Sequence, residues 1–260
     1  MPFKLFDRDK LNIKPLDERI SDINIDIIKD PAADINIIDD SRYSQLAEAI
    51  YNANKKDATV LLMYGAHVIR SGCALYMIKL MEDGLVTHFA TNGAGAIHDF
   101  EFAYLGKTCE SVAKYISEGQ FGLWKETGYI NEALKLGLVD NMGAGESIGK
   151  YIEENNFKYK NSSVLAAAYK NKVPATVHIG VGNDIIHEHP NASGAVLGQA
   201  SYIDFLIYAE SVMNLENGVF LNFGSAVTGP EVYLKALAMA RNVAHQSGKS
   251  INHITTAVFD

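Results

Sequence analysis

The sequence has few cysteines and no long apolar run, and these shortages exclude several classes of protein. Its 260 residues include two cysteines, Cys73 and Cys109, and neither belongs to a Cys-x-x-Cys pair. Two separate thiols in a chain of this length are typical of reduced cytosolic residues, not of a disulfide framework. No apolar run approaches the roughly 20 residues that cross a bilayer. The first eight residues carry charges where a signal peptide has its apolar stretch. We therefore expect a cytoplasmic protein that does not bind membranes.

Basic residues are also in the minority. The chain has 23 lysines and arginines against 31 aspartates and glutamates, which gives a net charge of −8. Binding to nucleic acid needs a basic surface that neutralises phosphates, so nucleic acid is excluded as the main ligand. With 48% hydrophobic and 21% charged residues, the composition is that of an ordinary globular protein.

The first 56 residues differ from the rest. Between Asp17 and Asp40 lie eight acidic and two basic residues, interleaved with isoleucines, and Asp-Ile-Asn-Ile occurs at both 22–25 and 34–37. Because the isoleucines need burial, we predict that residues 1–56 form an acidic arm that packs on the body or on a partner subunit. A partly ordered acidic leader fits the composition equally well. Residues 57–260 are predicted to form the main domain.

From residue 58 onward, apolar runs alternate with helical patterns. Continuous apolar runs typical of buried strands occupy 58–64, 85–91, 163–168, 175–179, 218–223 and 252–259. Helical spacing is found over 71–80, 111–154, 202–214 and 230–244. This alternation predicts an α/β fold with a mainly parallel sheet and helices on both faces. Ligands of such sheets bind beyond the carboxyl ends of the strands, so the turns after the strands are the candidate sites.

The first two turns carry polar and small residues. In the turn over 64–73, Ser71 can cap the following helix, whose N-terminus attracts anions, although an ordinary capped turn fits equally well. In the turn after the second strand, small glycines within 92–95 allow a ligand to approach the backbone. His98, Asp99 and Glu101 follow within one helical turn. This cluster indicates a site that holds a cation.

Two further features suggest other chemistry. His178, His187 and His189 lie in one stretch, so a zinc or iron site is conceivable. Their spacing fits no standard zinc motif, which favours a polar loop or substrate contacts. Cys73 follows a glycine near a predicted helix start, where the pKa of a thiol falls. A catalytic cysteine is the less favoured interpretation, since no histidine is tied to it by sequence.

Taken together, the turns resemble those of the deoxyhypusine synthase superfamily. The stretch His67-Val68-Ile69-Arg70-Ser71-Gly72-Cys73 is similar to Asn-Leu-Ile-Ser-Ser-Gly-Cys of that family, and 90–99 is similar to its Val-Thr-Thr-Ala-Gly-Gly-Val-Glu-Glu-Asp. Residues 163–174 resemble the strand and loop before its Asp-Gly-Ser loop. Residues 218–225 resemble its triple-glycine turn, and 256–260 its Thr-Ala-Gln-Glu-Phe-Asp. The five blocks occur in the same order over about three quarters of the chain.

The resemblance implies a Rossmann-like domain that binds NAD and forms a homotetramer. It implies NAD-dependent transfer of an aminobutyl group from a polyamine such as spermidine to an amine acceptor. The acidic residues of the turns would complement such a polycation, with His98, Asp99 and Glu101 as substrate contacts. By position, the resemblance implies nucleotide contacts from His67, Ser71, Gly72, Thr91, Asn92, Gly93, Asp184, Gly224, Ser225, Thr256 and Ala257.

Three departures from the family leave other hypotheses open. His98 stands where the family has a glutamate, and Thr228-Gly229-Pro230 where it has Lys-His-His. The family's nucleophilic lysine lies on a segment after the position of Asp260. One alternative is therefore a non-catalytic relative that keeps the fold. The other is a metal-dependent enzyme that uses the histidines of 178–189.

Overall fold

The computed structural model describes residues 3–33 and 39–259. The second Asp-Ile-Asn-Ile copy at 34–37 and Asp260 of the last motif lie outside the described residues. Among the helices that are described, none is long and apolar enough to cross a membrane.

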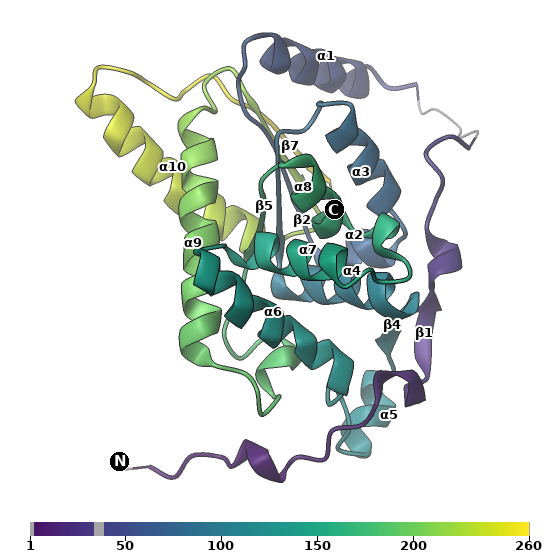
Figure 1. Ribbon diagram of the computed structural model, residues 1–260. Helices are drawn as coiled ribbons and strands as arrows, with labels where there is room; N and C mark the ends of the chain where they lie inside the picture. The colour runs from purple at the N-terminus through teal and green to yellow at the C-terminus, as the bar shows by residue number, and fades with distance from the viewer. Residues whose placement is uncertain (1–2, 34–38, 260) are drawn as a thin grey trace.

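The centre of the molecule is a sheet of five parallel strands (Figure 1). The strands run in the spatial order β5-β3-β2-β6-β7. In chain order this is 3-2-1-4-5, the order of Rossmann folds, with the switch point between β2 and β6. The predicted α/β fold with a parallel sheet is confirmed. The strands are β2 (Val60–Tyr64), β3 (His88–Asn92), β5 (Ala175–His178), β6 (Val219–Phe223) and β7 (Thr255–Phe259).

Helices cover both faces of the sheet, which explains why its central strand is apolar throughout. All five residues of β2 are buried. Val60, Leu62 and Tyr64 pack in a core cluster with α1 (Ser41–Lys55) and α3 (Ala74–Glu82). Leu61 and Met63 face the opposite way, toward α9 (Gly194–Met213) and α10 (Thr228–Gln246). A strand that alternates between two apolar layers needs no polar position, so its sequence reads as a continuous apolar run.

A second group of helices packs beside the edge strand β5. Its core contains Phe100, Leu134, Ile148 and Leu165, one from each of four helices. These helices are α4 (Gly93–Leu105), α6 (Tyr129–Gly137), α7 (Ala144–Glu154) and α8 (Val164–Asn171). The remaining elements are α2 (Ala66–Arg70), α5 (Val112–Ser117), the antiparallel pair β1 (Ser21–Asn24) and β4 (Lys107–Glu110), and 3-10 turns at 8–10, 16–18, 25–27, 125–128, 138–140, 160–162 and 185–187.

Several predicted elements differ from the structure. The apolar run 163–168, predicted as a strand, is helix α8, because Ser163 caps it by accepting from the Ala166 N–H. Gly93 and Gly95, predicted in a turn, form the first turn of α4, which Asn92 caps. The helical stretch 111–154 is divided among α5, α6 and α7. Within the segment predicted as an arm, residues 41–55 form α1.

The N-terminal segment is attached to the body by a buried ion pair. The Arg19 guanidinium donates to both carboxylate oxygens of Glu101, at 2.8 and 2.9 Å, and both side chains are 1% exposed. The hydroxyls of Thr108 and Thr127 also donate to Glu101. Burial by itself raises the pKa of Glu101, but Arg19 and these donors outweigh it and the pKa is lowered. The pair therefore stays ionised, with every oxygen of the carboxylate used.

We expect Arg19→Met to lower the free energy of unfolding by about 3–5 kcal/mol, because it leaves the Glu101 charge buried and unpaired. Denaturation by urea measures this loss. The matched control is Lys150→Met, which removes one partner of the exposed Lys150–Asp140 pair and should cost less than ~1 kcal/mol. Equal small losses in both variants would contradict the assigned role of Arg19.

Candidate functional site

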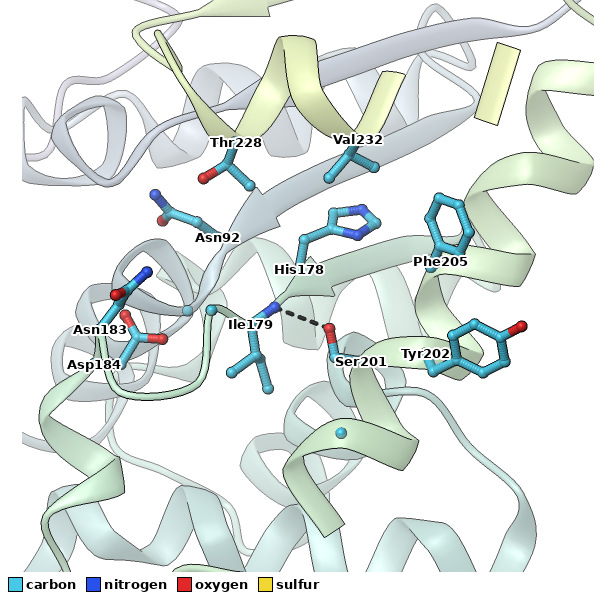
Figure 2. Close-up of a pocket in the computed structure, with 13 residues that line it drawn as sticks. Asn92, His178, Ile179, Asn183, Asp184, Ser201, Tyr202, Phe205, Thr228 and Val232 are labelled. Carbon is cyan, nitrogen blue, oxygen red and sulfur yellow. Dashed lines mark hydrogen bonds between the residues drawn. The ribbon is translucent and has the colours of Figure 1, made fainter. Parts of the chain in front are cut away.

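A cavity of about 430 Å³ lies at the carboxyl edge of the sheet; we call it the first cavity (Figure 2). Its floor is formed by the ends of β3 and β5 and the turns after them. Residues of α9 and of the first two turns of α10 form the opposite wall. The lining residues are Asn92, Gly93, His178, Ile179, Gly180, Asn183, Asp184, Gly198, Ser201, Tyr202, Phe205, Thr228 and Val232.

A second cavity, of about 320 Å³, lies on the other side of the loop that follows β5. The two cavities share Asn183 and Asp184 as lining residues. The second cavity is rich in charged side chains. They are Arg19, Asp22, Arg70, Glu101, Glu110 and Asp184; His98 lines the same cavity as a neutral ring, because burial lowers its pKa to about 4. Asp184 therefore lies in the wall between a mainly neutral cavity and a charged one.

The buried Asp184 carboxyl group closes a capping box with the His187 N–H, but one of its oxygens has no donor. Its side chain is 8% exposed, and its Oδ2 atom has no hydrogen-bond partner among the described residues. Burial raises the pKa of Asp184 to about 6. Oδ2 lies against Gly93, where a Cβ atom would come within 2.0 Å of it, so a larger residue there would displace the Asp184 side chain. A buried acceptor without a donor is costly to leave unsatisfied, which makes Asp184 suited to a ligand that brings N–H or O–H groups.

His187 supports the same loop. Its Nδ1 atom accepts from the N–H groups of Gly182 and Asp184, at 3.0 and 3.2 Å. The neutral ring must then carry its proton on Nε2, which lies 3.9 Å from Asp184 Oδ2. Burial lowers the pKa of His187, which favours this neutral form. The ring thus holds the backbone that presents the Asp184 carboxyl group.

The three histidines predicted as metal ligands do not converge. His178 lines the first cavity, and its Nε2 atom lies 3.2 Å from Thr176 Oγ1. His189 donates from Nε2 to the Gly122 carbonyl, and His187 faces Asp184. Within residues 3–33 and 39–259, no group of three or more histidine, cysteine or acidic side chains is placed to hold a metal ion. The metal hypothesis therefore gains no support from this loop.

The three predicted substrate contacts on α4 have separate surroundings. Asp99 caps α8: it accepts from the Ser163 hydroxyl at 2.5 Å and from the N–H groups of Val164 and Leu165. Glu101 is paired with Arg19. His98 lines the second cavity, and its Nδ1 lies 2.7 Å from Thr108 Oγ1. The acidic side chains of this cluster thus make structural contacts, and His98 is the member that lines a cavity without being ion-paired.

Of the predicted nucleotide contacts, Asn92, Gly93 and Asp184 line the first cavity. Thr91 lies beneath it, where its hydroxyl donates to the Tyr64 carbonyl. Gly224 and Ser225 form the turn between β6 and α10, and Ser225 Oγ accepts from the Gly229 N–H. The structure therefore brings six of the predicted residues to one edge of the sheet.

The other predicted contacts lie elsewhere. A Cβ atom on Gly72 would come within 2.1 Å of the Ile27 carbonyl oxygen, so the N-terminal segment covers this position beside Ser71. His67 Nε2 lies 3.2 Å from an Arg70 nitrogen. Thr256 and Ala257 are on β7 and line a separate cavity beside α1. These residues do not line either of the two cavities around Asp184.

The predicted helix cap at Ser71 and the predicted low pKa of the Cys73 thiol were wrong. Ser71 ends α2 instead of capping the next helix, and the N-cap residue of α3 is Cys73 itself. Burial raises the pKa of the Cys73 thiol instead of lowering it. A thiol with a raised pKa is a poor nucleophile, so the catalytic-cysteine interpretation loses its basis.

Sequence reasoning missed the wall formed by α9 and α10. Gly198, Ser201, Tyr202 and Phe205 are spaced i, i+3, i+4 and i+7, which places them on one face of α9. A small residue at the start of this face leaves room: a Cβ on Gly198 would meet no atom of the described chain within 4 Å. This spacing was visible in the sequence, but nothing in it linked α9 to the turn after β5.

Comparison with known proteins shows that this chain is similar to some of them in fold only. No protein-family model and no curated protein sequence matches the chain. Among solved structures, ArgZ, an arginine dihydrolase from the ornithine–ammonia cycle in cyanobacteria, matches with a TM-score of 0.52 and 17% identity over 86% of this chain and 31% of ArgZ. A conserved LOR/SDH protein from Methanococcus maripaludis S2 matches with a TM-score of 0.50 and 15% identity, over 88% and 63% of the two chains. The chain thus spans about a third of ArgZ.

Two further solved structures have TM-scores below 0.5, and this similarity is too low to support any inference about function. A deoxyhypusine synthase from Entamoeba histolytica has a TM-score of 0.43 and 12% identity, over 77% of this chain and 87% of that one. AgrE in ternary complex with ornithine and NAD+ has a TM-score of 0.49 and 16% identity, over 79% of this chain and 27% of AgrE. The comparisons establish a shared α/β fold and leave the specific family open.

The unsatisfied Asp184 carboxyl group makes a prediction for stability. Because its pKa is raised from 3.8 to about 6 in the folded protein, its ionisation costs stability as pH rises through this interval. Asp184→Asn should therefore be more stable than the parent by up to ~3 kcal/mol at pH 7.5 and equal to it below pH 3.8. Denaturation by urea across this pH range measures the difference.

Asp99→Asn is the matched contrast, since burial also raises the pKa of Asp99 to about 6 although its oxygens have donors. Both variants remove the cost of ionisation at pH 7.5, but the amide at position 99 also turns an N–H2 group toward existing donors. Asp99→Asn should therefore be less stable than Asp184→Asn at pH 7.5. Equal stabilities of the two variants would mean that Asp184 Oδ2 has a protein partner that this structure lacks.

Proposed function

We propose that the protein binds NAD at the carboxyl edge of its sheet and oxidises a small cationic amine at a carbon that carries nitrogen. The observation that carries the proposal is the buried Asp184 carboxyl group between two cavities, whose Oδ2 atom has no donor among the described residues. Such a group suits a ligand that brings hydroxyl or ammonium donors. The strand order, with its switch point between β2 and β6, supports a dinucleotide at this edge.

The residues present fit a dinucleotide in two respects. Ribose hydroxyls are donors that carboxylates accept in Rossmann folds, and Asp184 Oδ2 is such an acceptor. The glycine at 198 leaves open space on the α9 wall, so that wall can accept a flat ring. Asn92, Gly93, Asn183, Asp184, Thr228 and Val232 would hold the group. When bound, NAD supplies the acceptor for a hydride.

The protein's own residues then orient the substrate. The carboxyl groups of Asp22 and Asp184 line the second cavity and favour an ammonium group there. Glu110 adds negative charge, but its oxygens already accept from the Gly122 N–H and the Trp124 ring N–H. His178 lines the first cavity with a neutral ring, because burial lowers its pKa to about 4. A neutral imidazole can accept a proton from the reacting nitrogen. The aromatic and aliphatic side chains of Phe205 and Val232 limit access of water to that cavity.

In its more specific form, the proposal is the transfer implied by the resemblance to deoxyhypusine synthases. An aminobutyl group passes from a polyamine such as spermidine to an amine acceptor, in a homotetramer. No lysine lines either cavity in the described part of the chain. We therefore propose that the acceptor amine attacks the imine carbon of the oxidised substrate directly and displaces its propanediamine portion. The hydride removed in the first step then returns to the new imine, so the complete transfer gives the aminobutyl amine without net formation of NADH.

One observation favours a second candidate substrate. Arg70 lines the second cavity, and its Nε atom is buried without a hydrogen-bond partner among the described residues. A guanidinium group placed in this way recognises carboxylates. A cationic amino acid would place its carboxylate on Arg70 and its ammonium groups on the acidic side chains. Comparing spermidine with ornithine as substrate separates the two candidates.

We expect NAD to bind the purified protein in calorimetry, and NADH to form when spermidine or ornithine is added. Gly198→Leu should weaken NAD binding at least tenfold, because its side chain extends into the first cavity. Gly194→Leu is the matched control: it is also on α9 with open space around it, but it does not line the cavity. It should bind NAD like the parent.

Two results would count against the proposal. The first is the absence of NAD binding together with the absence of amine turnover. The second is equal NAD affinity in both glycine variants, which would place the nucleotide outside the first cavity.

A further inference from the structure

A chain of buried polar side chains leads away from the first cavity beneath α9. His178, which lines the cavity, has its Nε2 atom 3.2 Å from Thr176 Oγ1. The same hydroxyl lies 3.0 Å from His88 Nε2. His88 Nδ1 in turn lies 2.7 Å from Ser211 Oγ on α9. This series of side chains thus connects the carboxyl end of β5 with the start of β3 and ends at a half-buried serine.

The single hydroxyl between the rings couples their tautomers. Thr176 has one proton to donate, so it can donate to one ring only and must accept from the other. If it donates to His178, that ring carries its proton on Nδ1 and His88 carries one on Nε2. If it donates to His88, the positions are reversed. The two rings therefore always hold opposite tautomers. The hydrogen-bonded series of side chains can adopt two arrangements, which differ in the direction of its hydrogen bonds.

Packing keeps the rings in place and excludes water between them. His88, Thr176 and His178 are 0%, 1% and 6% exposed. Tyr208 contacts both rings edge to face, with centroids 5.5 and 5.1 Å away. Burial lowers the pKa of His88 to about 3 and that of His178 to about 4. A charged imidazolium is thus disfavoured, while a switch between neutral arrangements costs no buried charge.

We propose that His178, Thr176, His88 and Ser211 form a proton relay that removes the proton released by the substrate amine; this inference rests on the proposed amine oxidation. The amine gives its proton to His178 Nδ1, and the Nε2 proton of His178 moves to Thr176 Oγ1. Thr176 passes its own proton to His88 Nε2, and the Nδ1 proton of His88 moves to Ser211, which releases one to water. The relay ends in its other arrangement, with both rings neutral. After the product leaves, the same transfers run in reverse: His178 Nδ1 gives its proton to water in the first cavity, and a proton from water enters through Ser211.

Nitrogen NMR of the histidine rings tests the relay without any ligand. In the parent protein, the ¹⁵N shifts of His88 and His178 should report opposite tautomers. The fraction of His88 that is protonated on Nε2 should equal the fraction of His178 that is protonated on Nδ1. Thr176→Val removes the hydroxyl at nearly constant volume and should uncouple the two populations, while Thr176→Ser should restore the coupling. Identical tautomers in the two rings of the parent would overturn the relay.

Kinetics test the relay during turnover. Thr176→Val should lower the rate of NADH formation at least tenfold and change its solvent isotope effect, while NAD affinity stays within twofold. Thr176→Ser should recover at least a third of the parent rate. Ser211→Ala, on a half-buried helix position that readily accepts alanine, should lower the rate in the same direction; it provides the test if Thr176→Val fails to fold.

The outcomes separate this inference from the proposed function. Parent-like rates in both Thr176→Val and Ser211→Ala would overturn the relay and leave amine oxidation standing. A parent protein that neither binds NAD nor forms NADH would overturn the function, and with it the role of the relay, whatever the NMR coupling shows. Loss of NAD binding in Thr176→Val would assign Thr176 a structural role and overturn the relay as well.

Discussion

The parallel pairing of β5, β3 and β2 is the constraint on which the candidate site depends. Because the strands run in one direction, the residues that follow them meet at one edge of the sheet. Asn92 at the end of β3 and His178 at the end of β5 are paired in register, although 86 residues separate them along the chain. The long connection between these strands contains α4 to α8, of which α4, α6, α7 and α8 pack beside β5 and leave the edge open to α9 and α10.

The buried polar groups of the structure divide into satisfied and unsatisfied ones. Asp99 caps α8, and Glu101 binds Arg19, so both charges hold separate parts of the chain together. Asp184 has the same chemistry, but its Oδ2 atom has no donor among the described residues. Asp204 also has one such oxygen, although its other oxygen accepts from the N–H groups of Gly145 and Val177. Natural proteins pair nearly all buried polar atoms, so an exception in a cavity wall points to a ligand. Asp184 is the exception that lies at the carboxyl edge of the sheet, where ligands of this fold bind.

The sequence predicted the sheet well, since apolar runs and glycine-bearing turns are local signals. Four of its five strands coincide with runs at 58–64, 85–91, 175–179 and 218–223, and the fifth lies within 252–259. The run 163–168 was wrongly predicted as a strand because a buried helix and a buried strand have the same apolar composition. Deciding between them required the cap at Ser163 and its contact with Asp99, 64 residues away. Non-local contacts of this kind are invisible to periodicity.

The site was predictable in part. Asn92, Gly93 and Asp184 follow strands, and the resemblance to a known family pointed to them. Gly72 lies under the N-terminal segment, outside both cavities. The α9 wall was missed because nothing local in the sequence shows which helix packs over the turn after β5. The relay beneath α9 joins residues of β3, β5 and α9, so only the three-dimensional structure brings it into view.

The most direct test of the account is a crystal structure of the protein with NAD and a substrate amine. The account predicts NAD in the first cavity, with a hydroxyl or ammonium donor within hydrogen-bond distance of Asp184 Oδ2. Nucleotide bound elsewhere, for example in the cavity between β7 and α1, with Asp184 still without a donor, would contradict it.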